Sequence, residues 1–254
     1  MRLRFIVKGM PLSSFVRGMP SFLRDYLEIR RQAKQSGMAF PFDKFYPWME
    51  DKYEKSGIAS GHYFHQDLLV ANRIFTNKPV KHVDIGSLIG GFVAHVASFR
   101  EIEVFDIREL SVWMQNITFR RLDIMDKDFA LVDYCDSVSC LHALEHFGLG
   151  RYGDRVDYNG HILGWNNIYK MLSKGGKCYF SVPIGPQRIE FNAHRVFSLE
   201  YILKNMVSDR YEVDTFSYVD DKGDLVRDAV LDESSVRDSF SLNYGCGIFE
   251  LTKI

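Results

Sequence analysis

A short apolar run of the chain ends in an aspartate and leads into a loop rich in glycine. Asp84 ends the run, and Gly86, Gly90 and Gly91 follow it. Glycine lets the backbone approach a ligand closely and adopt positive φ, and the N-terminus of a following helix offers free N–H groups. This combination is typical of a nucleotide-type cofactor site at the carboxyl edge of a parallel sheet.

Two classes of cofactor compete for this loop. A dinucleotide site reads G-x-G-x-x-G and directs a helix N-terminus at a pyrophosphate, whereas this loop reads Gly86-Ser-Leu-Ile-Gly90-Gly91 and lacks the G-x-G. S-adenosylmethionine (SAM) has no phosphate, and its cationic amino group and sulfonium suit the carboxylate of Asp84. The loop therefore favours SAM. A tight turn without a ligand and an NAD-dependent sugar-modifying enzyme remain as alternatives.

Two further aspartates continue the pattern. Asp106 ends a second β-prone run, where a carboxylate can accept from both ribose hydroxyls, and Asp123 ends a third, where it can accept from an adenine amino group. Three successive strand ends that close on Asp predict an adenosine site. The residues expected at the cofactor are Asp84, Gly86, Ser87, Gly90, Asp106, Ile107, Asp123, Ile124, Leu141 and His142.

Histidines after two later strands could activate an acceptor. A hydroxyl acceptor needs a general base, because an alcohol is a weak nucleophile at neutral pH, and His is a common choice. His146 follows the fourth predicted strand, and His194 follows the fifth in a polar loop. The candidate catalytic residues are His146, His194, Glu145 and Asp154.

The stretch from residue 148 to 154, Gly-Leu-Gly-Arg-Tyr-Gly-Asp, is typical of a loop that binds substrate. Its arginine could hold a phosphate through two hydrogen bonds, and its tyrosine could stack on a sugar or a base. An ordinary flexible connector is the alternative. The predicted substrate-binding residues are Tyr63, His65, Gln66, Arg151 and Tyr152.

The elements that must position these residues alternate along the chain. Helices are expected over residues 63–75, 90–98, 108–114, 159–172 and 198–205, and strands over 80–85, 102–105, 117–122, 137–141, 177–182, 211–219 and 247–252. Such alternation is typical of βαβ units in a parallel sheet with helices on both faces. The last two strands have no clear helix between them and are expected to be antiparallel. The predicted fold class is α/β, with a Rossmann-like, mostly parallel sheet that ends in an antiparallel pair.

The sequence resembles class I SAM-dependent methyltransferases through residues 83–87, 104–106 and 137–146. It resembles more closely a domain-of-unknown-function family of methyltransferase-like proteins associated with surface-glycan synthesis, through residues 61–67, 145–154, 192–197 and 244–250. This resemblance implies O-methylation of a sugar or glycan intermediate. A non-catalytic scaffold is the alternative, because Leu88 stands where many methyltransferases have a second glycine and is expected to narrow the loop.

The resemblance also admits a metal site. Some methyltransferases carry E-x-x-E-H after the fourth strand and bind a divalent ion through it, and this chain has His142-x-x-Glu145-His146 with His194 as a possible fourth ligand. A histidine in the first position favours a softer metal than magnesium. A catalytic base, a metal site and a purely structural role for Glu145 and His146 all remain open.

Residues 1–60 lie outside the resemblance and are expected to form a helical arm and connector, separate from the domain at 61–254. An amphipathic helix is expected over residues 12–36. Residues 1–37 carry eight Lys and Arg side chains against two carboxylates. Such a basic arm can meet an anionic membrane surface, a partner or a phosphorylated substrate, and a solvated helix face is the alternative.

Bulk composition limits the remaining possibilities. The formal charge of −1 over 254 residues gives no case for nucleic-acid binding. The four cysteines form no CxxC pair, which predicts reduced thiols, and neither a membrane-spanning run nor a secretory signal is expected. We therefore expect a cytoplasmic enzyme that meets a small-molecule or glycan acceptor.

Overall fold

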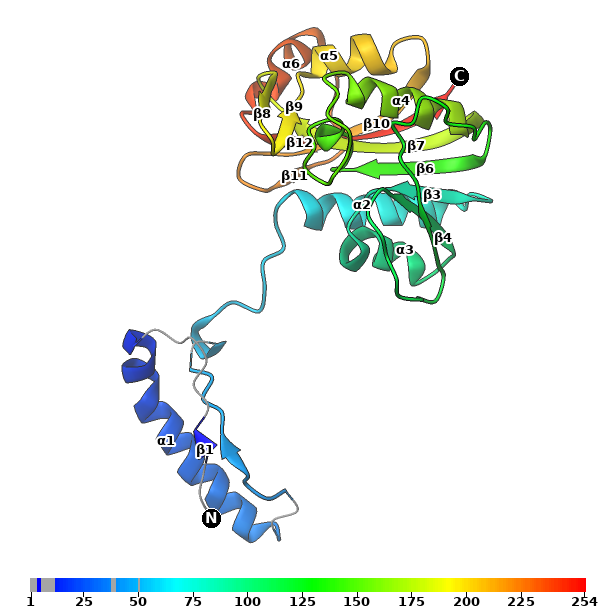
Figure 1. Cartoon of the computed structure of the whole chain (residues 1–254). Helices are drawn as coiled ribbons and strands as arrows, with labels where there is room; N and C mark the ends of the chain where they lie inside the picture. The colour runs from blue at the N-terminus through cyan, green and yellow to red at the C-terminus, as the bar shows by residue number, and fades with distance from the viewer. Residues whose placement is uncertain (1–3, 6–11, 38–39, 50) are drawn as a thin grey trace. The chain divides into compact units, whose positions relative to one another are not determined.

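The structure is a computed structural model that describes residues 4–5, 12–37, 40–49 and 51–254. The chain divides into two compact units, Met1–Ile58 and Ala59–Ile254 (Figure 1).

The larger unit is built on an eight-stranded sheet in the order β11-β10-β12-β7-β6-β3-β4-β5. Its strands are β3 (His82–Ile85), β4 (Ile102–Asp106), β5 (Ile117–Arg121), β6 (Cys135–Leu141), β7 (Leu172–Ile184), β10 (Tyr211–Val219), β11 (Leu225–Val226) and β12 (Gly245–Lys253). The strands from β5 to β7 pair in parallel, whereas β12 is antiparallel to both β7 and β10. The predicted fold class is therefore confirmed, including the antiparallel pair at its end.

Helices cover both faces of this sheet (Figure 1). They are α2 (His62–Asn77), α3 (Ala94–Ala97), α4 (Gly160–Met171), α5 (Leu199–Ile202) and α6 (Glu233–Asp238), with shorter helical turns η2 (Ile89–Val93), η3 (Leu144–His146), η4 (Leu203–Val207) and η5 (Ser239–Ser241). Trp165 of α4 packs against Phe180 of β7 on one face, and Ile74 of α2 belongs to the cluster on the other. Burying apolar side chains on both faces explains why the central strands are almost continuously apolar.

The sheet has its topological switch point between β3 and β6. From β3 the chain crosses to β4 and β5 on one side, and then returns to β6 on the other. Loops that leave neighbouring strands in opposite directions open a crevice at the carboxyl ends of those strands, which is where ligands bind in open α/β sheets.

Three sequence predictions about elements are wrong. Residues 108–114 form no helix, because the backbone N–H and guanidinium of Arg108 are bonded to Asp106 and hold the chain at the strand end. The polar loop expected around His194 is a hairpin of β8 (Arg188–Glu190) and β9 (His194–Val196). The segment between β10 and β12 contains α6, whose first N–H groups are capped by Asp232.

The smaller unit contains α1 (Leu12–Gln35), η1 (Asp51–Tyr53) and the short parallel pair β1 (Arg4–Phe5) and β2 (Lys44–Phe45). The helix expected over residues 12–36 is thus present and runs through Pro20. Tyr26 packs its ring against Phe42 and Phe45. Of the basic residues predicted here, Arg2 and Lys8 lie outside the described residues.

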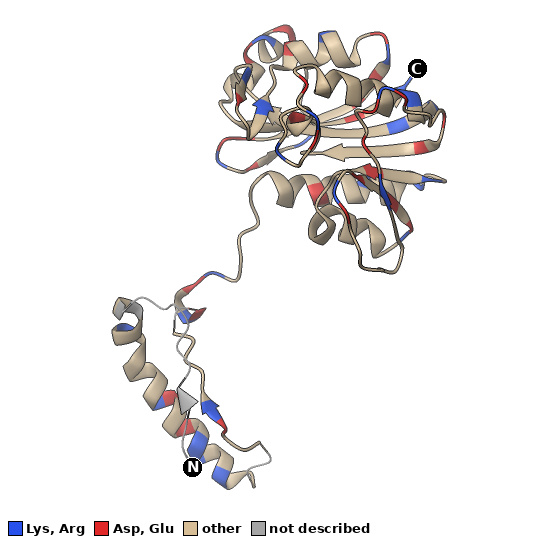
Figure 2. Ribbon diagram, in the orientation of Figure 1, with Lys and Arg blue, Asp and Glu red and all other residues tan. Residues whose placement is uncertain are grey.

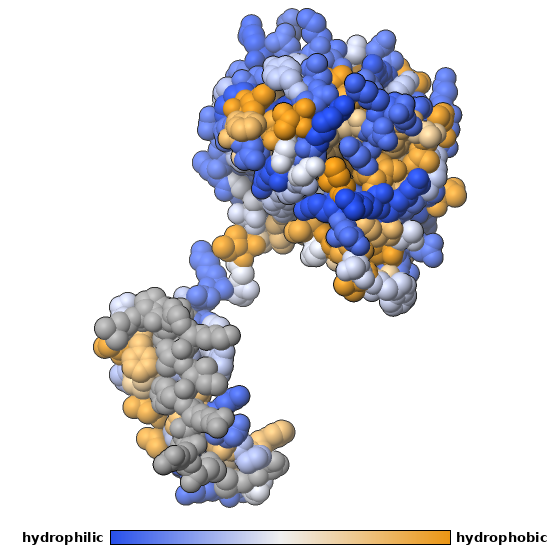
Figure 3. Space-filling view, in the orientation of Figure 1, coloured by the Kyte–Doolittle hydropathy of each residue, from blue (hydrophilic) through white to orange (hydrophobic). Residues whose placement is uncertain are grey.

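A second face of α1 is exposed. Val16, Leu23 and Leu27 are exposed on it, and Figure 3 shows apolar side chains on the visible surface of this unit. Figure 2 shows Lys and Arg in excess of Asp and Glu along the helix. Among the described residues, no helix is both long and apolar enough to cross a membrane.

Candidate functional site

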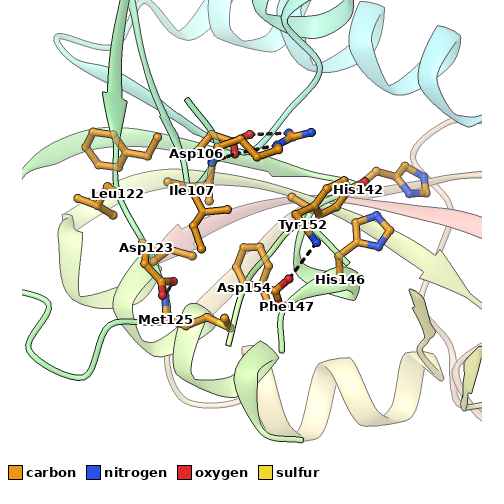
Figure 4. A pocket seen from close by; sticks show the side chains of 16 residues that line it. Asp106, Ile107, Leu122, Asp123, Met125, His142, His146, Phe147, Tyr152 and Asp154 are labelled. Carbon is orange, nitrogen blue, oxygen red and sulfur yellow. Dashed lines mark hydrogen bonds and ion pairs between the residues drawn. The ribbon is translucent and has the colours of Figure 1, made fainter. Parts of the chain in front are cut away.

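A cavity opens at the carboxyl ends of β3, β4 and β6, at the switch point of the sheet (Figure 4). Figure 4 shows the imidazoles of His142 and His146 toward one end, and Asp106, Leu122 and Asp123 toward the other. The lining residues are Ile85, Gly86, Phe105, Asp106, Ile107, Arg108, Leu122, Asp123, Ile124, Met125, His142, Ala143, His146, Phe147, Tyr152 and Asp154.

Asp84 stabilises the loop after β3 through hydrogen bonds and does not line the cavity. Its carboxylate accepts from the N–H and the hydroxyl of Ser87 at 3.0 and 2.7 Å, and from the hydroxyl of Ser139 at 2.6 Å. Burial raises the pKa of Asp84 to about 6, although these hydrogen bonds oppose the rise. Asp84 therefore orients the loop, and the predicted residue Ser87 is buried with it.

The glycines of the loop provide close approach. Gly86 has a φ of +69° and lines the cavity, and a Cβ on Gly91 would lie 2.8 Å from Asp67 Oδ2 of α2. Gly90 has open space around its Cα. Leu88, which is expected from the sequence to narrow the loop, is 63% exposed and is not among the residues that line the cavity.

Asp106 ends β4 at the cavity wall, and its carboxylate forms an ion pair with the guanidinium of Arg108. Arg108 Nη2 and Nε donate to the two carboxylate oxygens of Asp106 at 2.6 and 3.0 Å. The Arg108 guanidinium also lies 4.5 Å from the centre of the Tyr152 ring. A ribose hydroxyl at Asp106 would compete with Arg108 for these carboxylate oxygens.

The next part of the wall is apolar. Asp123 turns the chain after β5, since its Oδ1 accepts from the Met125 N–H at 2.8 Å. The two predicted residues Ile107 and Ile124 line the cavity together with Met125. The predicted residue Leu141 is buried in β6, belongs to the core cluster that includes Ile74 of α2, and does not line the cavity. Flat apolar walls beside a carboxylate suit an adenosine.

His146 of η3 is one of the residues that line the cavity. Its Nδ1–H donates to the Ala193 carbonyl at 2.7 Å, which fixes the tautomer and makes Nε2 the acceptor. Nε2 lies 3.7 Å from Glu145 Oε1. Burial lowers the pKa of His146, and Glu145 opposes this. The ring is therefore neutral at pH 7 and carries a fixed lone pair.

His142 is held differently. Its Nδ1 donates to Glu145 Oε1 at 2.7 Å, and both side chains are buried. Burial opposes a charge on His142, but Cys246 and Glu145 outweigh it and raise the pKa of His142 to about 10. Glu145 is therefore bonded to an imidazole and does not itself line the cavity. The backbone at His142 has a φ of +49°, an uncommon conformation for a non-glycine residue.

The loop from Gly148 to Asp154 is ordered by hydrogen bonds. Asp154 Oδ2 accepts from the N–H groups of Gly148 and Gly150, at 2.8 and 3.1 Å. Arg151 Nη1 donates to the Ala193 carbonyl at 2.9 Å, the same oxygen that holds His146. The Asp154 carboxylate thus links the backbone of the two glycines within this loop.

The remaining predicted residues lie outside the cavity lining. His194 Nε2 lies 3.2 Å from Glu190 Oε2 in the hairpin. Gln66 is buried and accepts from the Ser181 hydroxyl at 2.6 Å. Tyr63 packs its ring 5.1 Å from His142, and His65 lies beside Phe64 on α2. The buried hydrogen bond with Ser181 gives Gln66 a structural role.

The sequence missed several residues that the fold brings to this region. Arg108, Ala143 and Phe147 line the cavity, and His62 and Cys246 lie beside His142. Nothing in the local pattern marks Arg108 as a partner of Asp106. His62 and Cys246 did fall in the stretches 61–67 and 244–250 that carried the family resemblance, and this was the only signal for them.

Two solved structures are similar in fold. The 1,6-didemethyltoxoflavin-N1-methyltransferase of Burkholderia thailandensis, with 1,6-didemethyltoxoflavin and S-adenosylhomocysteine bound, matches with a TM-score of 0.53 and 12% identity, over 98% of this chain and 93% of that chain. The [4+2]-cyclase SpnF matches with a TM-score of 0.52 and 14% identity, over 74% of this chain and 80% of that chain. At these identities the similarity shows the fold alone, which is the Rossmann-like α/β fold that these two proteins share.

No curated protein matches the sequence. A family model described as "Caenorhabditis protein of unknown function, DUF268" matches residues 92–239. The matched segment runs from η2 to the end of α6 and includes every lining residue except Ile85 and Gly86. Since that segment is more than half of the chain and holds most of the cavity, the protein belongs to the DUF268 family.

Proposed function

We propose that the protein is a SAM-dependent methyltransferase that methylates a hydroxyl of a sugar or glycan intermediate. The observation that carries the proposal is the juxtaposition of His146, a neutral imidazole with a fixed acceptor nitrogen, and a cavity with an adenosine-type wall. The class of acceptor rests on the family resemblance, and the reaction rests on the residues of the cavity.

The chain's residues fit a cationic adenosine ligand. Asp106, Asp123 and Asp154 line the cavity, whereas Arg108 is the one Lys or Arg among the lining residues, and it is paired with Asp106. A diphosphate would face this excess of carboxylates without a free cation. The cavity therefore favours SAM over NAD, because like charges repel most strongly where solvent is excluded.

Three groups would hold the cofactor. Asp106 would accept from the ribose hydroxyls once Arg108 moves aside, and Ile107 and Ile124 would flank the adenine. Gly86, with its positive φ, brings backbone close to the ligand. When bound, SAM supplies an electrophilic methyl group on a sulfonium.

His146 would remove the acceptor's proton. Its Nε2 accepts the hydroxyl proton while Nδ1–H stays on the Ala193 carbonyl. Glu145 Oε1, 3.7 Å from Nε2, stabilises the imidazolium that forms. Tyr152, between Arg108 and Arg151, offers a face on which a sugar can stack.

Calorimetry with S-adenosylhomocysteine tests the cofactor, and incubation with SAM and glycan extracts tests the reaction. We expect binding on the order of 10 μM, a typical cofactor affinity, and methylated product. No binding at millimolar ligand would overturn the proposal. Binding without any product would instead support the alternative of a non-catalytic scaffold.

We also propose that α1 docks on an anionic membrane surface and that the protein is cytoplasmic. Val16, Leu23 and Leu27 form an exposed apolar stripe, as in helices that lie in a lipid interface. The exposed Arg24 and Arg31 follow it in the sequence, each ion-paired with a carboxylate of α1. The proposed cytoplasmic location is supported by the four cysteines, which are all free, as suits a reducing compartment. Leu27→Glu should abolish co-sedimentation with phosphatidylserine vesicles, and equal co-sedimentation would refute docking.

A further inference from the structure

We propose that the larger unit binds one zinc ion through His62, His142 and Cys246. One ligand atom from each of these residues lies within 4.8 Å of the other two. They come from the first residue of α2, the residue after β6 and the second residue of β12. The cluster therefore depends on tertiary folding and joins α2 to the sheet.

His142 supplies the strongest sign that a ligand belongs here. Its Nδ1 is bonded to Glu145, and its Nε2 is buried without a hydrogen-bond partner among the described residues. A buried polar atom left unpaired costs about 1–3 kcal/mol. A metal on Nε2 would satisfy it. An imidazole bonded to a carboxylate on one nitrogen and to a metal on the other is the usual arrangement of metal-binding histidines.

His62 is supported in a similar way. It makes a hydrogen bond to the backbone of Tyr244, which leaves its other ring nitrogen for a ligand. Its ring stacks on that of His142, with centroids 5.1 Å apart and planes within 14°. The Tyr244 ring packs against its other side at 5.4 Å. Both imidazoles are thus positioned by neighbours before any metal arrives.

Cys246 completes a neutral buried site. Its thiol is fully buried in β12, and on binding the protons held by the thiol and the imidazole nitrogens pass to solvent. The two positive charges of the ion are then balanced by the Cys246 thiolate and the Glu145 carboxylate. Such a balance matters because an unpaired charge is costly in the interior.

The donor set selects the metal. Two imidazoles and a thiolate favour zinc over magnesium or calcium, which prefer oxygen ligands. In a tetrahedral zinc site the ligand atoms lie about 3.4–3.6 Å apart, given the usual Zn–N and Zn–S lengths. Because the ligand atoms lie within 4.8 Å of one another, the distances between them would shorten by at most about 1 Å to reach this. With three protein ligands a fourth position would stay open, and of the three ligands His142 is the one that also lines the cavity.

The ligand set predicted from the sequence shares only His142 with this cluster. Glu145 lies behind His142 as a hydrogen-bond partner, His146 is bonded to Ala193, and His194 faces Glu190. The inference does not depend on the proposed methyl transfer, because metal binding is measured without SAM or an acceptor.

The experiment uses the full-length protein, stripped by a chelator and titrated with Co²⁺ as a spectroscopic probe. We expect one equivalent to bind, a near-ultraviolet thiolate-to-cobalt absorption, and displacement by Zn²⁺. Cys246→Ser should lose the absorption. Cys178→Ser, which removes another fully buried thiol in the adjacent strand β7, should keep it.

Two further variants keep the test decisive if Cys246→Ser does not fold. His62→Ala changes a half-buried side chain at a helix end and should weaken Co²⁺ binding at least 10-fold with the circular dichroism unchanged. Glu145→Gln should weaken it about 10- to 100-fold, as for other partners of ligating histidines. Lack of the absorption in the wild type, its persistence in a folded Cys246→Ser protein, or unchanged affinity in His62→Ala would each overturn the proposal.

Discussion

Two imidazoles four residues apart, His142 and His146, differ because their Nδ1–H groups meet different oxygens. His146 donates to the Ala193 carbonyl and is neutral, since burial lowers its pKa. His142 donates to the Glu145 carboxylate, which together with Cys246 raises its pKa to about 10. A base needs a free lone pair at pH 7, so the structure favours His146 for proton removal.

Replacement of His146 tests this assignment. We expect His146→Gln to lower kcat about 10²- to 10⁴-fold, the usual contribution of a general base, while S-adenosylhomocysteine binds as before. His194→Gln is the matched comparison, because His194 does not line the cavity. If the His194 variant loses more activity than the His146 variant, the base has been assigned to the wrong residue.

The pair of Asp106 and Arg108 predicts opposite effects on cofactor binding. Asp106→Ala removes the acceptor of the ribose hydroxyls and should weaken S-adenosylhomocysteine binding about 10- to 100-fold, since hydrogen bonds to a charged group contribute about 1.5–3 kcal/mol. Arg108→Ala removes a competitor for the same carboxylate and should leave the affinity equal or higher. Calorimetry distinguishes the two, and parallel losses would mean that Arg108 itself binds the ligand.

Whether a site residue could be predicted from the sequence depended on how far along the chain its partners lie. Asp106 and Gly86 could be located from the sequence because each follows its own strand and lies at the cavity for that reason alone. His62 and Cys246 meet His142 across 80 and 104 residues of chain, and no local pattern encodes that meeting. Asp84 was expected at the ligand, but its carboxylate accepts hydrogen bonds from Ser87 in the loop and from Ser139 in β6.

At the scale of elements, hydrophobic periodicity predicted the sheet well, because its central strands are buried on both faces and read as apolar runs. It failed where polar contacts set the backbone. The segment after β4 has enough apolar residues for a helix, yet Arg108 is tied to Asp106. The β8–β9 hairpin is short and polar, so its pairing leaves no apolar alternation to detect.

The helical turn η2, which follows the loop after β3, contains a matched pair of glycines. A Cβ on Gly91 would lie 2.8 Å from Asp67 Oδ2, and its φ and ψ of −111° and −111° are non-helical. We expect Gly91→Ala to destabilise the protein by about 1–3 kcal/mol. Gly90→Ala has open space and should change stability by less than about 1 kcal/mol. Chemical denaturation measures both, and equal effects would contradict the close approach of α2 to this turn.

Asp84 links the whole molecule's stability to pH. Its pKa is raised by burial from the usual 3.8 to about 6, so the folded state binds the proton more tightly than the unfolded state. The protonated Asp84 therefore adds to the free energy of unfolding below pH 3.8. This contribution, about 3 kcal/mol, is lost as the pH rises through 6. The stability of Asp84→Asn relative to the wild type should therefore increase between pH 4 and pH 7. Denaturant titrations at both pH values measure it, and a constant difference would refute the buried ionisation.

The distribution of the core predicts that the larger unit folds without the smaller one. Both clusters of buried apolar residues begin at Leu69 or later, so neither includes a described residue of Met1–Ile58. Stability follows buried apolar area, and the fragment 59–254 keeps all of the area in these two clusters. We expect it to unfold cooperatively, with a midpoint within about 2–4 °C of the full chain, the shift that 1 kcal/mol gives in a domain of this size. Differential scanning calorimetry of the fragment and the full chain measures this midpoint. A fragment that fails to fold, or melts far lower, would mean that residues 1–58 stabilise the domain through contacts outside its two clusters.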